Sequence, residues 1–261
     1  MTILELVLIG LLVGAFVGIS GVGGGSIMTP VLILVAGINP LVAVGTDLLY
    51  SVPTKIFGAF LHSRQQTLDW RIVRALLWGG IPGAIAGVAL LHVLRRTVDL
   101  GALNAIVKHS VGVALFVAAA SLLYSLIVSH KTGRLQTASH TSAGGDRTIW
   151  LVAAGATVGF FVSLTSIGSG SMTLPLLLLL APVVGIRRLI GTDIAFAAFL
   201  IPVAAFGHAT LGDINYRVAL ALLAGSLPGV FIGSRLCKYL SEVWLRPAIA
   251  TVLVIAGSRL I

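Results

Sequence analysis

An internal duplication constrains the fold of this chain more than any other feature of its sequence. Residues 45–87 align without a gap on residues 191–233 at a constant offset of 146. Both copies contain the motif Gly-Thr-Asp, the motif Ala-Phe-x-His, an arginine, a Pro-Gly pair and a further glycine. Upstream, Gly23-Gly24-Gly25-Ser26 aligns on Gly168-Ser169-Gly170-Ser171 at an offset of 145. The chain therefore consists of two related halves.

The composition places these halves in a lipid bilayer. Hydrophobic residues make up 57% of the 261 residues, charged residues only 10%, and the mean hydropathy is +1.08. This leaves too little polar surface to cover a water-soluble domain. The net charge of +9 does not indicate a nucleic-acid partner, because the basic residues are scattered between apolar runs. We expect the partners to be lipid and a small anionic substrate.

Ten apolar segments predict an all-α, polytopic transmembrane helix bundle. A helix needs roughly 20 residues to span the hydrocarbon core. The second segment of each half is shorter, begins at a Gly/Ser cluster and has proline in its opening turns. It is either a re-entrant half-helix or a short tilted span. The segments are 3–20, 26–38, 41–62, 72–93, 102–128, 149–165, 171–184, 189–208, 217–236 and 244–260.

The distribution of loop charges favours ten crossings. If every segment crosses, eleven arginines and lysines lie on one side of the membrane and four on the other; with re-entrant short segments the division is eight to seven. Cytoplasmic loops are enriched in these residues. Five crossings per half predict two inverted repeats, residues 1–128 and 148–261, with broken helices at their interface. Residues 129–147 would form a cytoplasmic linker, and both termini would lie outside.

The Gly/Ser clusters are the first candidate site. Glycines expose backbone N–H groups, and a helix N-terminus within a membrane attracts anions. Two opposed broken helices would place one anion site at the midplane of a secondary transporter. Alternatively, the small residues only allow close helix packing. The candidate substrate-binding residues are Gly23, Gly24, Gly25, Ser26, Gly168, Ser169, Gly170 and Ser171.

Ionisable residues inside the apolar segments are the second candidate site. Asp47, Asp193 and Lys55 would each cost roughly 2.5–3.5 kcal/mol on insertion scales, so each should face a polar interior or a partner. Lys55 has no lysine at the matching position, which makes it a candidate substrate-facing cation; an ion pair that joins two helices is the alternative. The aspartates are candidate proton carriers or hydrogen-bond partners of Thr46 and Thr192. Both threonines are also candidate substrate-binding residues.

His62 and His208 end their helices at matching positions. They are proton-coupling candidates, although we favour helix capping, because a terminal histidine commonly interacts with the last carbonyls. The sequence contains no metal-ligand cluster, nucleophile elbow or Cys-His arrangement. We therefore expect no enzyme activity, no metal and no cofactor.

Three sequence runs and their echoes in the second half resemble the TauE/SafE sulfite exporter family. They are Gly-Val-Gly-Gly-Gly-Ser-Ile-Met-Thr-Pro (21–30), Val-Gly-Thr-Asp-Leu-Leu-Tyr (44–50) and Leu-Asp-Trp (68–70). The resemblance implies a multi-pass carrier in a bacterial or archaeal inner membrane. It also implies a small anion as cargo, such as sulfite or an organosulfonate like sulfoacetate, with export driven by the proton gradient. The glycine-rich turns, the Gly-Thr-Asp motifs and Lys55 carry over as candidate functional residues.

The expected function is therefore a secondary transporter that moves a small sulfur-containing anion by alternating access. Two other classes of protein fit the same sequence. An anion channel would use the same pore without coupling, and a membrane scaffold or sensor would not transport. The sequence leaves a homodimer open.

Overall fold

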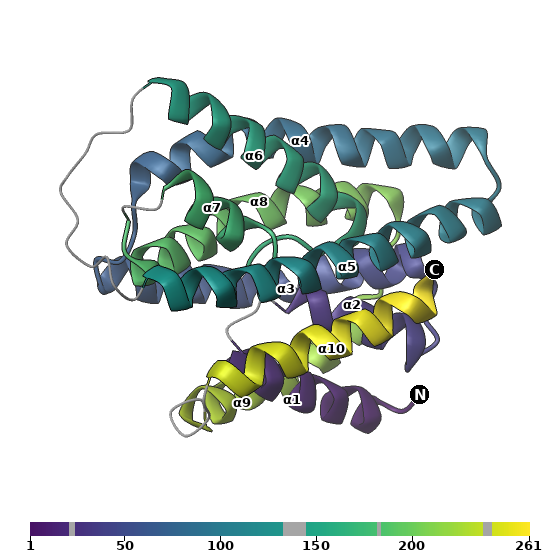
Figure 1. Ribbon diagram of the computed structural model, residues 1–261. Coiled ribbons are helices and arrows are strands. Elements are labelled where there is room, and N and C mark those ends of the chain that lie inside the picture. Colours follow the sequence, from purple (N-terminus) through teal and green to yellow (C-terminus); the bar gives the residue numbers. More distant parts are fainter. Residues whose placement is uncertain (21–23, 133–144, 182–183, 237–241) are drawn as a thin grey trace.

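The computed structural model describes residues 1–20, 24–132, 145–181, 184–236 and 242–261, and over these residues the chain is all-helical. The ten expected segments are confirmed as helices (Figure 1). In chain order the helices are α1 (Ile3–Ser20), α2 (Gly25–Leu34), α3 (Pro40–Arg64), α4 (Trp70–Thr97), α5 (Leu100–Thr132), α6 (Gly145–Thr165), α7 (Thr173–Leu180), α8 (Ile186–Leu211), α9 (Tyr216–Leu236) and α10 (Glu242–Leu260).

Five of the described helices are long and apolar enough to cross a membrane. They are Trp70–Thr97, Leu100–Tyr124, Arg147–Thr165, Arg187–Leu211 and Tyr216–Gly233. Helix α3 has 25 residues but is less apolar, since it contains Asp47, Lys55 and several hydroxyl side chains. The charged and hydroxyl side chains of such a helix should face protein rather than lipid.

Helices α2 and α7 are much shorter than a membrane span. They have 10 and 8 residues, which correspond to about 15 and 12 Å at 1.5 Å per residue. The hydrocarbon core is about 30 Å thick, so the helical part of each covers about half of it. The expectation of broken helices is confirmed at both places. Whether the chain crosses the membrane there stays a prediction.

The two halves are intertwined rather than side by side. Helix α1 packs along α9 at one end of the bundle, and α6 packs along α4 at the other, so the first helix of each half contacts the fourth helix of the other half (Figure 1). Between these ends, α3 packs on α8 and α5 on α10. Equivalent helices thus make equivalent contacts. The inverted orientation of the halves in the membrane stays a prediction.

Glycines at matching positions allow these helix pairs to approach closely. A Cβ atom on Gly83 of α4 would lie 2.2 Å from the carbonyl oxygen of Ala156 in α6. A Cβ atom on Gly229 of α9 would lie 2.2 Å from the carbonyl oxygen of Leu11 in α1. Both distances are far below van der Waals contact. The duplicated glycines therefore form helix packing surfaces of the kind common in membranes.

The linker expected at 129–147 is shorter in the structure, because α5 runs to Thr132 and α6 begins at Gly145. Most of that linker, residues 133–144, lies outside the described residues.

Candidate functional site

The threonines of the two Gly-Thr-Asp motifs connect the halves by hydrogen bonds. The backbone N–H of Asn215 donates to Thr46 Oγ1 at 3.0 Å, and the backbone N–H of Asp69 donates to Thr192 Oγ1 at 3.0 Å. Asp69 and Asn215 occupy matching positions before α4 and α9, where their side chains accept hydrogen bonds from the first helical turn. Each threonine thus binds the half to which it does not belong. Its role in substrate binding stays a prediction.

The glycines of the same motifs face the opposite half. A Cβ atom on Gly45 would lie 2.4 Å from the carbonyl oxygen of Asp213 and 3.1 Å from Nδ1 of His208. A Cβ atom on Gly191 would lie at the same two distances from the carbonyl oxygen of Thr67 and from Nδ1 of His62. The loop after α3 therefore packs against α8, and the loop after α8 against α3.

The two histidines form different hydrogen bonds. His62 Nδ1 lies 2.8 Å from Thr67 Oγ1, and Thr67 Oγ1 donates to the carbonyl of His62. The His62 side chain therefore contributes, through Thr67, to the hydrogen bonds at the end of α3. His208 Nε2 lies 2.8 Å from the carbonyl oxygen of Ser163 in α6. For His208 the capping interpretation is wrong, because its partner belongs to another helix. The part of either histidine in proton coupling stays a prediction.

Asp47 is buried inside the bundle and has an oxygen without a partner. Thr29 in α2 donates through Oγ1 to Asp47 Oδ2 at 2.5 Å. The hydroxyls of Ser51 and Ser166 lie close to the same carboxyl group. Asp47 Oδ1 has no hydrogen-bond partner among the described residues. The short helix α2 is therefore attached to α3 by a buried hydrogen bond.

Asp193 repeats this arrangement in the second half. The backbone N–H of Gly170 and the hydroxyl of Thr173, at the start of α7, lie close to its carboxyl group. Asp193 Oδ1 and the hydroxyl of Ser171 are both buried and have no partner among the described residues. The carbonyl of Ser171 accepts a hydrogen bond from Ser121 in α5. The start of α7 thus presents free polar atoms beside a carboxyl group.

The start of α2 lies against the segment that follows α6, and whether the two Gly/Ser clusters form one site stays a prediction. A Cβ atom on Gly25 would lie 2.1 Å from the carbonyl oxygen of Ser166, which precedes α7. Ser166 is buried and has φ of 60°, a left-handed conformation that is uncommon for serine. Gly170 has φ of 87°, which glycine adopts without strain.

The remaining residues of the two clusters lie next to the starts of α2 and α7 in the chain. Gly24 is the residue before α2, Ser26 is buried in its first turn, and Ser169 is buried before α7. The carbonyl oxygen of Gly168 accepts hydrogen bonds from the start of α7. Gly23 lies outside the described residues.

Lys55 is the charged side chain that links the two carboxyl groups electrostatically. It is half-buried on α3 and interacts electrostatically with both Asp47 and Asp193. Among the described residues the one side-chain ion pair is between Arg95 and Asp213, so Lys55 is not bonded directly to either aspartate. Its ammonium group is therefore free for another partner. Substrate binding by Lys55 stays a prediction.

Three hydroxyl residues that contact the aspartates were not predicted from the sequence, namely Thr29, Thr173 and Ser166. A signal for the threonines is present, because Gly-Ser-Ile-Met-Thr in the first half parallels Gly-Ser-Met-Thr in the second. The spacing differs by one residue, so an alignment without gaps does not pair them. Nothing in the sequence distinguishes Ser166.

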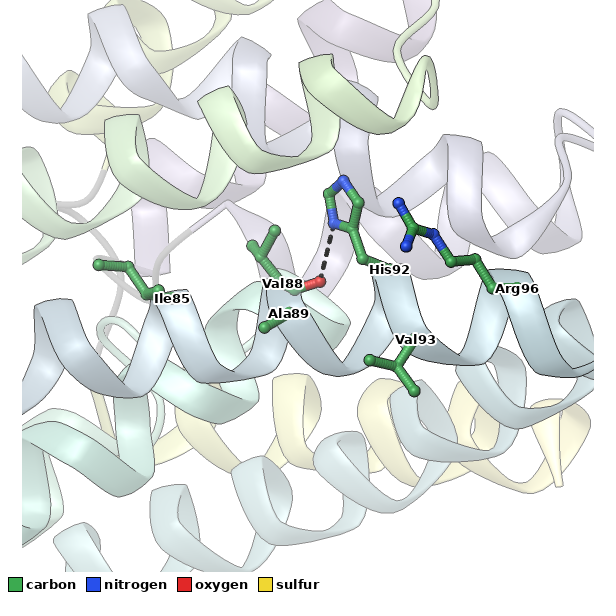
Figure 2. Close-up of a pocket in the computed structure, with 6 residues that line it drawn as sticks. All are labelled: Ile85, Val88, Ala89, His92, Val93 and Arg96. Atoms are coloured by element: carbon green, nitrogen blue, oxygen red, sulfur yellow. Dashed lines mark hydrogen bonds between the residues drawn. The ribbon is translucent and has the colours of Figure 1, made fainter.

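A pocket of about 410 Å³ lies along α4, where Val88 packs against Gly207 of α8 and His92 interacts electrostatically with His208 (Figure 2). Its lining combines four apolar side chains with His92 and Arg96, whose side chains point to the same side of the helix. His92 donates through Nδ1 to the carbonyl of Val88. The neighbouring Arg95 pairs with Asp213 at 3.0 Å and donates to the carbonyl of Leu211. None of the expected site residues lines this pocket.

The long apolar helices are those of a multi-pass membrane protein, and the comparisons with known proteins identify it as a membrane transporter rather than an enzyme. Residues 6–260 match the sequence model of the family described as "Sulfite exporter TauE/SafE". The chain belongs to this family. It is 38% identical over 257 residues to "Probable membrane transporter protein YjnA" of Bacillus subtilis, covering 98% of this chain and 99% of the relative.

Two further Bacillus subtilis proteins are similar along their length. The chain is 25% identical to "Probable membrane transporter protein YunE", over 100% of this chain and 98% of that protein. It is 26% identical to "Probable membrane transporter protein YdhB", over 98% and 99%. No solved structure matches the chain.

Proposed function

We propose that this chain is a secondary transporter of a small sulfur-containing anion, either sulfite or an organosulfonate such as sulfoacetate. It works by alternating access across the inner membrane and is coupled to protons, with export as the expected direction. The observation that carries the proposal is that Lys55, which forms no ion pair, interacts electrostatically with two buried carboxyl groups. Each of these carboxyl groups contacts a broken helix or the turn before it. Family membership supports the same substrate class.

Asp47, Asp193 and Lys55, which we call the buried centre, lie near groups that can bind a small oxyanion. Lys55 supplies a mobile ammonium group with three donors. The start of α7 adds the unpartnered hydroxyl of Ser171, and its backbone N–H groups carry partial positive charge. Broken helices whose ends face a midplane site are typical of secondary transporters.

Charge movement in proteoliposomes on a solid-supported membrane tests the proposal. Sulfite, sulfoacetate, sulfate, chloride and acetate would each be applied with and without a pH gradient. We expect a saturable response to the sulfur anions that shifts with the pH gradient. An uncoupled current that follows the ion's own gradient would indicate a channel, and silence toward every anion would favour a scaffold or sensor.

Lys55→Met tests the position of the site in the same assay. We expect it to abolish binding of sulfite and sulfoacetate without unfolding the protein. Lys108→Met is the matched control, because Lys108 is a half-buried lysine on another membrane helix, α5. Unchanged binding in Lys55→Met would remove this residue from the site.

A further inference from the structure

The buried centre contains more negative than positive groups. Asp47 and Asp193 contribute two carboxyl groups, and Lys55 is the cation that interacts with both. When all three are ionised the centre has a net charge of −1, which repels the anion that the proposed function requires. We propose that the anion binds only together with at least one proton, held by Asp47 or Asp193, and that anion and proton cross the membrane in the same direction. This inference rests on the proposed function.

Burial makes this charge balance decisive. Asp47 is 0% and Asp193 3% exposed, so water does not screen them from a bound anion. Coulomb energies between charges in such an environment are several times larger than in bulk water. An anion placed beside two ionised carboxylates and one ammonium group is therefore disfavoured. Each proton taken up reduces the negative charge of the centre by one.

The hydrogen bonds leave one oxygen of each aspartate free to take up a proton. Oδ2 of Asp47 already accepts from Thr29, whereas Oδ1 of Asp47 and Oδ1 of Asp193 are buried without partners. An ionised carboxylate can only accept hydrogen bonds, but a protonated carboxyl group also donates one. Protonation at Oδ1 turns each aspartate from a group that repels an oxyanion into a donor to it. The hydroxyl of Ser171, also buried and unpartnered, is a further donor.

The groups that face the two aspartates leave no other source of compensating charge. Helix α3 presents Lys55 and Tyr50 to Asp47, while α2 and the segment before α7 present the hydroxyls of Thr29 and Ser166. Asp193 faces Lys55, the hydroxyl of Thr173 and the N–H of Gly170. Among these described neighbours Lys55 is the one cation. Protons, or another small cation, must supply the rest.

Movement of anion and proton in the same direction determines which proton gradient drives anion uptake. An inward proton gradient then drives anion uptake, and export occurs only where the outward gradient of the anion exceeds the inward gradient of the proton. A carrier that exchanges one anion for a proton moving the opposite way would have the reverse sign. The sign can be measured without knowing the direction of flux in the cell.

Proteoliposomes that contain a pH-sensitive dye test this directly. Sulfoacetate is added outside at pH 7.5 with equal pH on both sides, and the membrane potential is clamped with potassium and valinomycin. At this pH the probe itself carries no exchangeable proton, so any proton movement requires the protein. We expect the lumen to acidify as the anion enters, and the apparent Kd to rise up to tenfold per pH unit for one coupled proton. Exchange of labelled sulfoacetate is measured in the same vesicles.

The variant Asp47→Asn/Asp193→Asn assigns the proton to these residues. Asparagine mimics the neutral side chain but cannot take up or release a proton, so we expect the number of protons that enter per molecule of sulfoacetate exchanged to fall toward zero. The single variants Asp47→Asn and Asp193→Asn show which residue contributes more. Asp99→Asn is the matched control, because Asp99 is exposed between α4 and α5. The lumen of vesicles that contain this variant should acidify as much as with the unaltered protein.

Each other result of the unaltered protein overturns the inference. Exchange of sulfoacetate with an alkaline lumen, or with no pH change, would exclude co-movement while leaving the transporter in place. Exchange that requires Na⁺ and moves no protons would assign the compensating charge to a metal cation instead. Absence of exchange would remove the proposed function together with this inference. The folding of the variants does not affect these outcomes, because the unaltered protein alone determines the sign.

Discussion

The backbone N–H of Asn215 donates a hydrogen bond to the hydroxyl of Thr46 at 3.0 Å. At the matching positions, Asp69 and Thr192 form the same bond at the same distance. These two bonds join α3 and α8 to the starts of α9 and α4, across the boundary between the halves. Because Asp47 and Asp193 follow the threonines directly, the bonds also position the carboxyl groups of the centre.

Removal of either hydroxyl should destabilise the contact between the halves. Thr46→Val and Thr192→Val each leave a partly buried N–H without an acceptor, which costs about 1–3 kcal/mol. We expect a lower thermal transition in detergent for each variant and a roughly additive loss in the double variant. Thr46→Ser retains the acceptor and is the control. An equal loss in Thr46→Ser would show that the methyl group, not the hydrogen bond, matters.

The close approach of α4 and α6 predicts a severe effect of one added methyl group. In Gly83→Ala the new Cβ lies 2.2 Å from the backbone oxygen of Ala156, so the helices must separate. Overpacking of this kind typically costs about 1–3 kcal/mol. We expect lower yield of monodisperse protein and a lower thermal transition, measured by fluorescence-detected size exclusion. Gly229→Ala should behave alike.

Gly185→Ala is the control for these two variants. No atom lies within 4 Å of a Cβ added there, and its φ of −57° suits alanine. A thermal transition as low in Gly185→Ala as in Gly83→Ala would contradict the packing explanation.

The sequence predicts the helices well because apolar runs and turn residues are local signals. It also predicts the two short helices, since the second segment of each half begins at a Gly/Ser cluster and is too short to span the membrane. It does not predict that α1 packs along α9, because nothing local identifies the partner of a helix whose faces are all apolar. The contact of Thr29 with Asp47 was missed for the same reason: hydrogen bonds between helices depend on the three-dimensional arrangement.

The histidines show the limit of arguments from duplicated sequence. His62 and His208 occupy matching positions, yet the first bonds to Thr67 and the second to the backbone of Ser163. The residue that corresponds to Thr67 is Asp213, which pairs with Arg95 instead. A single difference between the halves therefore changes a whole set of side-chain partners.

Two substitutions at Ser166 can separate the effect of its left-handed backbone conformation from the effect of its hydroxyl group. Ser166→Gly relieves a conformation that costs a serine about 1 kcal/mol, whereas Ser166→Ala retains it; both remove the hydroxyl beside Asp47. We expect Ser166→Gly to have the higher thermal transition. If the hydroxyl acts at the site, both variants should alter sulfoacetate exchange to the same extent. Exchange that follows the thermal transition instead would make Ser166 a purely structural residue.

The ion pair of Arg95 and Asp213 predicts a stability change that depends on pH. Burial raises the pKa of Asp213, and the adjacent guanidinium of Arg95 lowers it. Arg95→Gln removes the compensating cation, so the ionised carboxyl becomes more costly in the folded state. A carboxyl group whose pKa is higher in the folded protein than in the unfolded chain destabilises the fold above its unfolded pKa, and protonation relieves the loss as pH falls.

We therefore expect Arg95→Gln to lower the thermal transition more at pH 8 than at pH 5. Because the Arg95 side chain is 36% exposed, the loss at pH 8 should be only about 1–2 kcal/mol, below that of a fully buried pair. Asp213→Asn in the same background removes the uncompensated charge and should restore most of the loss at pH 8. A loss that is equal at both pH values, or that Asp213→Asn leaves unchanged, would place the effect in the hydrogen bond from Arg95 to the carbonyl of Leu211.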